Sequence, residues 1–377
     1  MKLFGWKGAA APRPVLSRAS SVGVGMLGEW PSGYEAQVRA AVSANPVAQR
    51  AVRLVSEACG GAAVIASGAS ATENARALDL VRHVSAGQGL IETLALHLLL
   101  HGNGFVQIIP DADGEPYELF ALRPERVSVD YDNNGWPVGY IYRVGERVTR
   151  LWAEDGRGRT AIMHLKAINP LDDHLGLGCL GAASGPVAIH NAATSWNKAL
   201  LDNAARPSGA LVYDSGKDGA VLSAEQFARL KAEMEAAYQG AINAGRPMLL
   251  EGGLKWQALS MTPAEMDFVA LKASAAREIA LAFGVPPMLL GLPGDNTYAN
   301  YKEANKALWR QTILPLMTKI LGGIAQGLRP VFPGLELMVD LDKVSELADE
   351  RSALWERVSG AAFLSDEEKR AMLGIGA

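Results

Sequence analysis

The sequence predicts an α+β fold with more than one structural part, on the basis of three observations. Its 377 residues exceed the length of an average single domain. Between Phe105 and Lys166 apolar and polar residues alternate, which is the period of short β-strands. Before and after this region apolar residues recur every three or four positions, the period of helices that bury one face. Because the strand candidates follow one another directly, we expect antiparallel sheets rather than a parallel sheet with alternating helices.

The N-terminal part begins with a segment typical of a flexible arm. Residues 1–25 are rich in Ala, Pro, Gly and Ser and lack the apolar core of a signal peptide. A helix is predicted from Tyr34 to Glu57, and Asn45-Pro46 can divide it into two. Three further elements are expected before the sheet region: a short strand at 59–66, a polar loop at 66–74 and a helix at 90–100.

The sheet region and the elements after it follow from local signals. Asp113-Gly114, Asn133-Asn134-Gly135 and Asp155-Gly156 are turn signals between strands. The strand candidates are 105–109, 117–122, 126–131, 137–144, 147–152 and 161–166. After them we expect a helix at 180–203, a strand at 209–213, a helix at 222–239 opened by a Ser223/Gln226 capping box, two short strands around Gly252-Gly253, a strand at 335–342, a helix at 344–359 and a short helix from Ser365.

Residues 262–321 predict a helix, a stiff loop and a second helix. Thr262, Pro263 and Glu265 form a helix start with a capping box. Gly284 is placed to end this helix in a left-handed conformation, and Pro286-Pro287 prevents its continuation. One buried face is predicted from the spacing of Phe268, Leu271, Ala275, Ile279 and Ala282.

The second helix of this stretch is expected from Tyr298 to about Leu321, with an interruption at Pro315. Pro315 lacks a backbone donor and would clash with the carbonyl of Gln311, which predicts a kink or the start of a separate helix. Lys302, Lys306 and Arg310, four residues apart, form one basic stripe along this helix. An ordinary solvated face is the alternative interpretation of this stripe.

Composition limits the classes of function. With 49% hydrophobic and 20% charged residues the chain is typical of globular proteins. A formal net charge of −4 argues against a protein that grips nucleic acid through many phosphates, although it allows one through which nucleic acid passes. The two cysteines, Cys59 and Cys179, have no metal or redox spacing. No run of about 20 apolar residues predicts a membrane-spanning helix.

Three groups of residues resemble chemical sites, and for each a structural role is the stronger interpretation. Gly176 to Gly181 matches the dinucleotide fingerprint G-x-G-x-x-G, but the preceding strand ends near Lys166, so a glycine-rich entry to a helix is favoured. His97 and His101 share a helix face without a third metal ligand. The acidic groups are Asp172, Asp173 with His174, and Asp340 with Asp342. The sequence therefore predicts no catalytic residues, no metal, no cofactor and no enzyme.

Several collinear segments together resemble a known family. These segments are 94–129, which contains the Gly-Asn helix end and the Asp-Gly turn; 164–183, with Asn-Pro-Leu-Asp-Asp-His-Leu-Gly; 201–216, with Arg-Pro-Ser-Gly; 277–291, with Phe-Gly-Val-Pro-Pro; and 296–317. The combination resembles the portal proteins of tailed double-stranded-DNA bacteriophages, in the compact branch typical of long-tailed phages. The resemblance covers about residues 30–375.

The resemblance implies a twelve-subunit ring at one capsid vertex, with a central tunnel for DNA packaging and ejection. It also implies a portal fold with named regions. These are an N-terminal arm at 1–25, an α+β wing at 26–221, stem helices at 222–240 and 264–284, a β clip at 241–263, a tunnel loop at 285–299, a kinked tunnel helix at 300–327, a strand returning to the wing at 328–343 and a short helical crown at 344–377.

The resemblance further implies partners and contact residues. DNA contact is expected from the stripe and the loop tip: Lys302, Lys306, Arg310, Asp295, Asn296, Thr297 and Tyr298. Contact with the motor and neck is expected from the clip: Arg246, Glu251, Lys255 and Trp256. The implied partners are other copies of the chain, double-stranded DNA without sequence specificity, the large terminase subunit, a neck adaptor and the major capsid protein, with no membrane.

The implied location is the virion of a phage, prophage or gene transfer agent, after assembly in the bacterial cytoplasm. Two alternatives remain at this point. One is a head–tail adaptor, although adaptors are usually smaller. The other is a nucleotide-dependent enzyme that uses the Gly176–Gly181 loop.

Overall fold

The computed structural model describes residues 33–202, 209–213, 223–238, 254–258, 267–292 and 297–374. They divide into two units. One unit combines Met1–Ser184 with Ala280–Ala377, and the other is Gly185–Ile279. Helices and short antiparallel sheets make up both, as the α+β prediction requires. Among the described residues, no helix is both long and apolar enough to cross a membrane.

The first unit opens with helices that pack into its core. Helix α1 (Tyr34–Val38) continues into a π-helical turn, Arg39–Ser43, and α2 (Pro46–Gly61) follows. The predicted division at Asn45-Pro46 is confirmed, because the buried Asn45 side chain accepts hydrogen bonds from the amides of Val47 and Ala48 and caps α2. Helix α4 (Leu90–His101) contacts α2, and its C-terminus is Gly102 with a φ of 80°.

The polar loop predicted at 66–74 is wrong over its second half. Strand β1 (Val64–Ser67) ends in the first half of this segment, and helix α3 (Ala71–Arg82) begins four residues after Ser67. Ser70 accepts a hydrogen bond from the amide of Glu73, and the Glu73 carboxylate accepts one from the amide of Ser70. This capping box satisfies the free amides of the first turn, so the small polar residues start a helix.

The six predicted strands are present as two three-stranded antiparallel sheets. The first has the order β5-β4-β9, formed by Pro116–Leu122, Asn103–Pro110 and Ile162–Lys166. The second has the order β6-β7-β8, formed by Val127–Tyr131, Pro137–Val144 and Arg147–Trp152. The core between them contains Phe105, Leu122, Val127, Tyr140 and Ile162. Because only one face of β6-β7-β8 is buried, these strands alternate in sequence.

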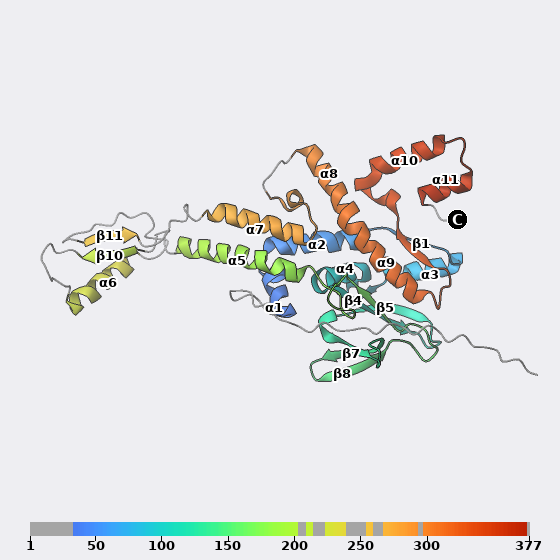
Figure 1. Cartoon of the computed structure of the whole chain (residues 1–377), viewed down its shortest axis with the longest axis horizontal. Coiled ribbons are helices and arrows are strands. Elements are labelled where there is room, and N and C mark those ends of the chain that lie inside the picture. The colour runs from blue at the N-terminus through green and yellow to red at the C-terminus, as the bar shows by residue number, and fades with distance from the viewer. Residues whose placement is uncertain are drawn as a thin grey trace, which may run out of the picture. The chain divides into compact units, whose positions relative to one another are not determined.

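A long helix and a two-stranded sheet connect the C-terminal part to this body (Figure 1). Strand β12 (Glu336–Val339) pairs antiparallel with β1, with Val64 opposite Val339. Helix α9 (Leu314–Leu328) contacts β12 and β9 and buries Met317, Ile320, Leu321, Ile324 and Leu328. A Cβ on Gly323 would lie 2.4 Å from a terminal methyl of Leu165, so α9 approaches β9 closely at this glycine.

The C-terminal segment consists of short helices, as predicted. Two 3-10 turns, Leu341–Lys343 and Ser345–Leu347, lead into α10 (Ala348–Gly360). Helix α11 (Asp366–Leu373) begins with a capping box between Ser365 and Glu368. A small hairpin of β2 (Val84–Ser85) and β3 (Gln88–Gly89) completes the first unit.

The second unit contains helices and one strand pair. Strand β10 (Gly209–Tyr213) pairs antiparallel with β11 (Leu254–Ala258), and α6 (Ala224–Tyr238) starts with the predicted capping box, in which Ser223 accepts a hydrogen bond from the amide of Gln226. Helices α5 (Leu180–Asp202) and α7 (Phe268–Ala282) run from this unit into the first.

The prediction of one buried face along α7 is only partly correct. Ala275 and Ile279 are buried, whereas Leu271 is 43% exposed. The buried residues of α7 lie in its C-terminal half. In the N-terminal half, the ring of Phe268 stacks on the ring of Trp196. The cap predicted at Thr262 lies outside the described residues.

Candidate nucleic-acid interface

The loop predicted to contact DNA has a rigid base. Gly284 follows α7 with a φ of 65°, and Thr312 donates a hydrogen bond to its carbonyl at 2.6 Å. A Cβ on Gly284 would lie 2.8 Å from the Thr312 hydroxyl. After Pro286 the chain forms a 3-10 turn, Pro287–Leu290, which ends at Gly291 with a φ of 73°. The tip residues Asp295 and Asn296 lie outside the described residues, so their contact with DNA stays a prediction.

Helix α8 (Tyr298–Leu308) begins directly after the loop. Thr297 caps it by accepting a hydrogen bond from the amide of Asn300 at 3.2 Å. Tyr298 is 85% exposed, and Tyr301 is 51% exposed one turn later. Thr297 therefore fixes the helix start, whereas the Tyr298 ring is available to a partner.

The interruption predicted at Pro315 takes the form of a π-helical turn, Trp309–Ile313, between α8 and α9. The amide of Leu314 donates to the carbonyl of Trp309, five residues back, and the backbone remains helical on both sides. A π-helical turn is a known cause of local helix distortion, and this one ends two residues before Pro315. The change in geometry thus lies in the turn that precedes Pro315.

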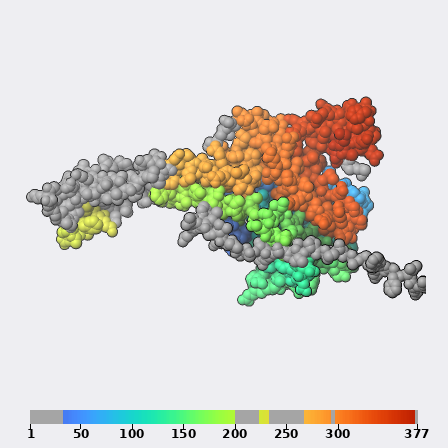
Figure 2. Space-filling view, in the orientation of Figure 1, coloured from blue at the N-terminus to red at the C-terminus, as the bar shows by residue number. Residues whose placement is uncertain are grey.

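The basic stripe contacts α10 of the same chain. Lys302 pairs with Asp349, and Arg310 pairs with Glu350. Between them, the Lys306 ammonium lies 3.0 Å from Glu303 and 3.9 Å from Glu350. Figure 2 shows the C-terminal helices packed against the segment of α8 and α9. The three cations therefore meet three carboxylates, two of which belong to the first turn of α10.

The ion pair between Lys302 and Asp349 alters the titration of both groups. The hydrogen bond to Asp349 and the negative charge of Asp349 raise the pKa of Lys302. The same hydrogen bond and the charge of Lys302 lower the pKa of Asp349. Both groups are thus held ionised at neutral pH, and any phosphate that approaches Lys302 competes with a carboxylate. Sequence reasoning missed this partner because Asp349 is 47 residues away from Lys302.

The residues predicted for the clip are described only in part. Lys255 and Trp256 belong to β11, where they lie opposite Val212 and Leu211 of β10. Arg246 and Glu251 lie outside the described residues. Motor and neck contact through these four residues remains a prediction.

The glycine-rich segment from Gly176 has a packing role. A Cβ on Gly176 would lie 2.0 Å from the carbonyl oxygen of Gly102, and one on Gly178 would lie 2.3 Å from that of Leu100. The amide of Cys179, at the start of α5, donates to the carbonyl of Leu99 at 2.8 Å. The glycines thus allow this segment to pack against the end of α4. A bound pyrophosphate would need open space and free amides at the same place, so the packing argues against a nucleotide site there.

Asn103, which sequence reasoning did not single out, is the polar centre of this packing. Its side chain is fully buried, its Oδ1 accepts from the amide of Gly176 at 2.7 Å, and its Nδ2 donates to the carbonyl of Gly176 at 3.1 Å. The Nε2 of His164 also lies 3.0 Å from Oδ1, and the ring of His101 lies within hydrogen-bonding distance of Nδ2. One amide therefore joins α4, β4, β9 and the glycine segment.

The two histidines considered as a metal pair are in different surroundings. Burial lowers the pKa of His97 to about 4, and the neighbouring His101 and Arg123 contribute to this shift. His101 contacts Asn103 and the edge of the Tyr34 ring. His97 is therefore a neutral core residue at neutral pH, and His101 belongs to the Asn103 network.

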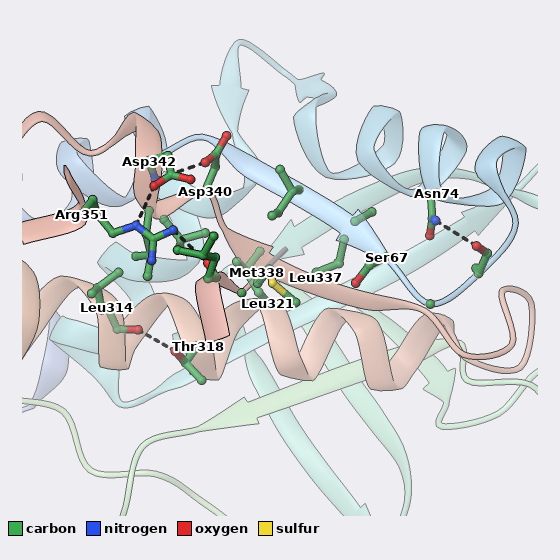
Figure 3. Close-up of a pocket in the computed structure, with 18 residues that line it drawn as sticks. Ser67, Asn74, Leu314, Thr318, Leu321, Leu337, Met338, Asp340, Asp342 and Arg351 are labelled. Atoms are coloured by element: carbon green, nitrogen blue, oxygen red, sulfur yellow. Dashed lines mark hydrogen bonds and ion pairs between the residues drawn. The ribbon is translucent and has the colours of Figure 1, made fainter. Parts of the chain in front are cut away.

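Protein donors occupy the acidic groups that were considered as metal ligands. Asp342 accepts hydrogen bonds from Arg351 at 2.6 Å and from Trp355 at 3.1 Å, and Asp340 pairs with Lys343. They line a cavity of about 630 Å³ between β1, β12 and α9 (Figure 3). Asp172 accepts from the amides of His174 and Leu175 and thus closes a turn. Among the described residues no three acidic, histidine or cysteine side chains form a metal-ligand group.

Comparison with known proteins identifies the relatives of this chain. Residues 46–374 match the family model described as phage portal protein. An uncharacterized protein of Rickettsia felis is 42% identical over 297 residues, which cover 77% of this chain and 74% of that protein.

Two solved structures extend the comparison. A chain in the neck of a native gene transfer agent particle, computed with C12 symmetry, is 47% identical. The match covers 92% of this chain and 94% of that one, with a TM-score of 0.69. An HK97 family phage portal protein from Corynebacterium diphtheriae has a TM-score of 0.57 at 17% identity, over 83% of this chain and 96% of that one, which demonstrates a shared fold.

Proposed function

The chain belongs to the phage portal protein family, and from this we propose that it forms the ring at one capsid vertex through which double-stranded DNA enters and leaves. One observation carries the proposal. The 47% identity to a chain in a gene transfer agent neck extends over 92% of this chain, so nearly every element has a counterpart there. The ring, with twelve subunits, would contain further copies of this chain. The particle would be a gene transfer agent or a related prophage.

The chemistry of the described residues suits a passive conduit. With a formal net charge of −4, the subunit would not hold DNA through many phosphates. The basic residues of the stripe are few, and carboxylates already partner them. DNA would therefore meet weak and exchangeable contacts, which permit sliding. Movement would come from an external motor, and we assign no enzymatic activity to this chain.

The regional assignments predicted from the family resemblance form part of this proposal. The β10–β11 pair would belong to the clip that contacts the large terminase subunit during packaging and the neck adaptor afterwards. The sheets of the first unit would form the wing beside the major capsid protein. Thr297 and Tyr298, after the rigid loop base, would face the tunnel with the stripe residues Lys302, Lys306 and Arg310. Assembly would take place in the bacterial cytoplasm before the ring is built into the virion.

Electron microscopy and native mass spectrometry of the purified full-length protein test the ring. We expect closed rings with a central hole and a mass that is an integral multiple of 39.9 kDa. A protein that stays monomeric across concentration, salt and added capsid protein contradicts the proposal. An oligomer without a central hole contradicts the proposed DNA conduit and supports only self-association of the chain.

A further inference from the structure

The segment between β9 and α5, residues 167–178, is an ordered loop that exposes aliphatic side chains. Ile168 is 87% exposed, Leu171 is 77% exposed and Leu177 is 57% exposed. Single exposed apolar residues are common on protein surfaces. Here three exposed aliphatic side chains lie within ten positions of one loop.

The two ends of this loop touch each other. A Cβ on Gly176 would lie 2.7 Å from the amide nitrogen of Ala167, so the chain returns to its starting point within ten residues. Asn169 spans the loop by donating to the carbonyl of Leu175 at 2.8 Å and accepting from the amide of Leu171 at 3.0 Å. This arrangement is that of an Ω-loop, a compact surface loop with close ends.

Further contacts attach the loop to the body on both sides. His174 lies 2.7 Å from the carbonyl of Gly135 and packs on the ring of Tyr131, both in the β6–β7 hairpin. Lys166 donates to the carbonyl of Asp173 at 2.6 Å, and Lys319 of α9 donates to the carbonyl of Lys166 at 3.0 Å. The exposed leucine and isoleucine side chains are therefore carried by a backbone that is already ordered.

A preordered apolar loop has the properties of a protein-binding surface. Binding through it orders little additional chain, so most of the gain from burying the aliphatic side chains is retained. Aliphatic side chains can neither donate hydrogen bonds to phosphates nor neutralise their charge, so DNA is an unsuitable ligand for this loop. A closed ring, by contrast, requires each subunit to present two different complementary surfaces, one for each neighbour.

We propose that the Ω-loop 167–178 is one half of the contact between adjacent copies of this chain, with Ile168 and Leu171 buried against a different surface of the next subunit. This inference rests on the proposed ring. It adds to that proposal the segment that carries the contact and its head-to-tail character.

The test compares two double variants of the full-length protein with the wild type. In I168S/L171S the loop keeps its hydrogen bonds but loses its aliphatic contacts. The matched control is V84S/V148S, which removes two valines that are 58% and 55% exposed on other hairpins. Assembly is followed by native mass spectrometry against protein concentration. We expect half-assembly of I168S/L171S at a concentration at least about tenfold above that of the wild type and the control.

Half-assembly of I168S/L171S at the wild-type concentration overturns the proposal. If the wild type itself forms no ring, the proposed function fails, and this result is distinct from the loop variant failing alone. Thermal unfolding of the dilute monomers should be the same for all three proteins, because only exposed side chains change.

A photo-crosslink provides a second measurement that does not depend on the folding of the serine variant. With benzoylphenylalanine at position 171 of the assembled protein, we expect a product with another copy of this chain, attached outside residues 166–179. A product that joins two 167–178 loops indicates a twofold dimer and overturns the head-to-tail contact. A product only with a capsid or neck protein in whole particles assigns the loop to that partner and also overturns it.

Discussion

Two polar networks of this chain differ in burial, charge and sequence span. The Asn103 network is buried, neutral and joins segments up to 73 residues apart. The network between the basic stripe and α10 is largely exposed, ionic and joins segments 40 to 47 residues apart. A buried amide that loses its partners costs the full desolvation of the groups left behind, whereas exposed ion pairs gain little over water. The first network therefore fixes the fold, and the second can exchange partners.

Acidification should produce the largest effect, through His97, which is buried, and His164, which is partly buried. Burial lowers the pKa of His164 to about 3, with contributions from Lys166, His101 and His174, and lowers that of His97 to about 4. Because the unfolded chain binds protons below about pH 6.5 and the folded state does not, this stability is complete above pH 6.5 and is lost as the pH falls. At pH 5 each histidine should remove about 2 kcal/mol from the free energy of unfolding.

Urea unfolding at pH 7 and pH 5 measures this loss. The variant His97→Met replaces a buried ring that has an unpartnered Nδ1 by an apolar side chain of similar size. Its stability should fall less between the two pH values than that of the wild type. An unchanged pH dependence in this variant contradicts the assignment to His97.

Removing the Asn103 side chain should have the next largest effect. Asn103→Ala leaves the amide and carbonyl of Gly176 and the ring of His164 without their partner. We expect a loss of about 3 kcal/mol in the free energy of unfolding, measured by urea denaturation. Asn305→Ala is the matched control, because Asn305 is only partly buried and its amide donates to the carbonyl of Tyr301, one turn earlier in the same helix, so its loss should be under about 0.5 kcal/mol. Equal losses in both variants would remove the distinction between buried and exposed amides.

The glycine segment beside Asn103 offers a paired comparison within six residues. A Cβ on Gly178 would lie 2.3 Å from the carbonyl oxygen of Leu100, whereas one on Gly181 meets no atom within 4 Å. Gly178→Ala should destabilise the protein by about 2 kcal/mol through overpacking. Gly181→Ala, in the first turn of α5, should be neutral or slightly stabilising. Thermal unfolding compares the two variants, and a tolerated Gly178→Ala would show that the packing there can relax.

The parts of the fold that the sequence predicts correctly have local signals. Alternation and turn residues suffice for the strands between Asn103 and Lys166, and Asn45-Pro46 suffices for the helix boundary. Helix α3 was missed although Ser70 and Glu73 form a local capping box, because the surrounding alanines and glycine resemble a loop. That error was avoidable from the sequence.

The contacts of the candidate site depend on long-range folding. The stripe follows from the spacing of Lys302, Lys306 and Arg310, but nothing local indicates that Asp349 and Glu350 cover it. The role of Asn103 likewise depends on its hydrogen bond with Gly176, which is 73 residues later in the chain. Periodicity identifies which side chains share a face, whereas the partner of that face is decided by tertiary and subunit packing.

The smallest effect on stability, and a measurable effect on DNA, is expected from the α10 carboxylates. D349N/E350Q removes the carboxylates opposite Lys302 and Arg310 and leaves the helix intact. Because these pairs are exposed, the melting temperature should barely change. The stripe would then be uncovered, so the protein should bind duplex DNA more tightly, with a steeper dependence on salt. Adding K302E, K306E and R310E should abolish this gain, whereas D366N/E367Q in α11, which leaves the stripe pairs in place, should not produce it. Unchanged DNA binding in D349N/E350Q would mean that the stripe serves only to hold α10.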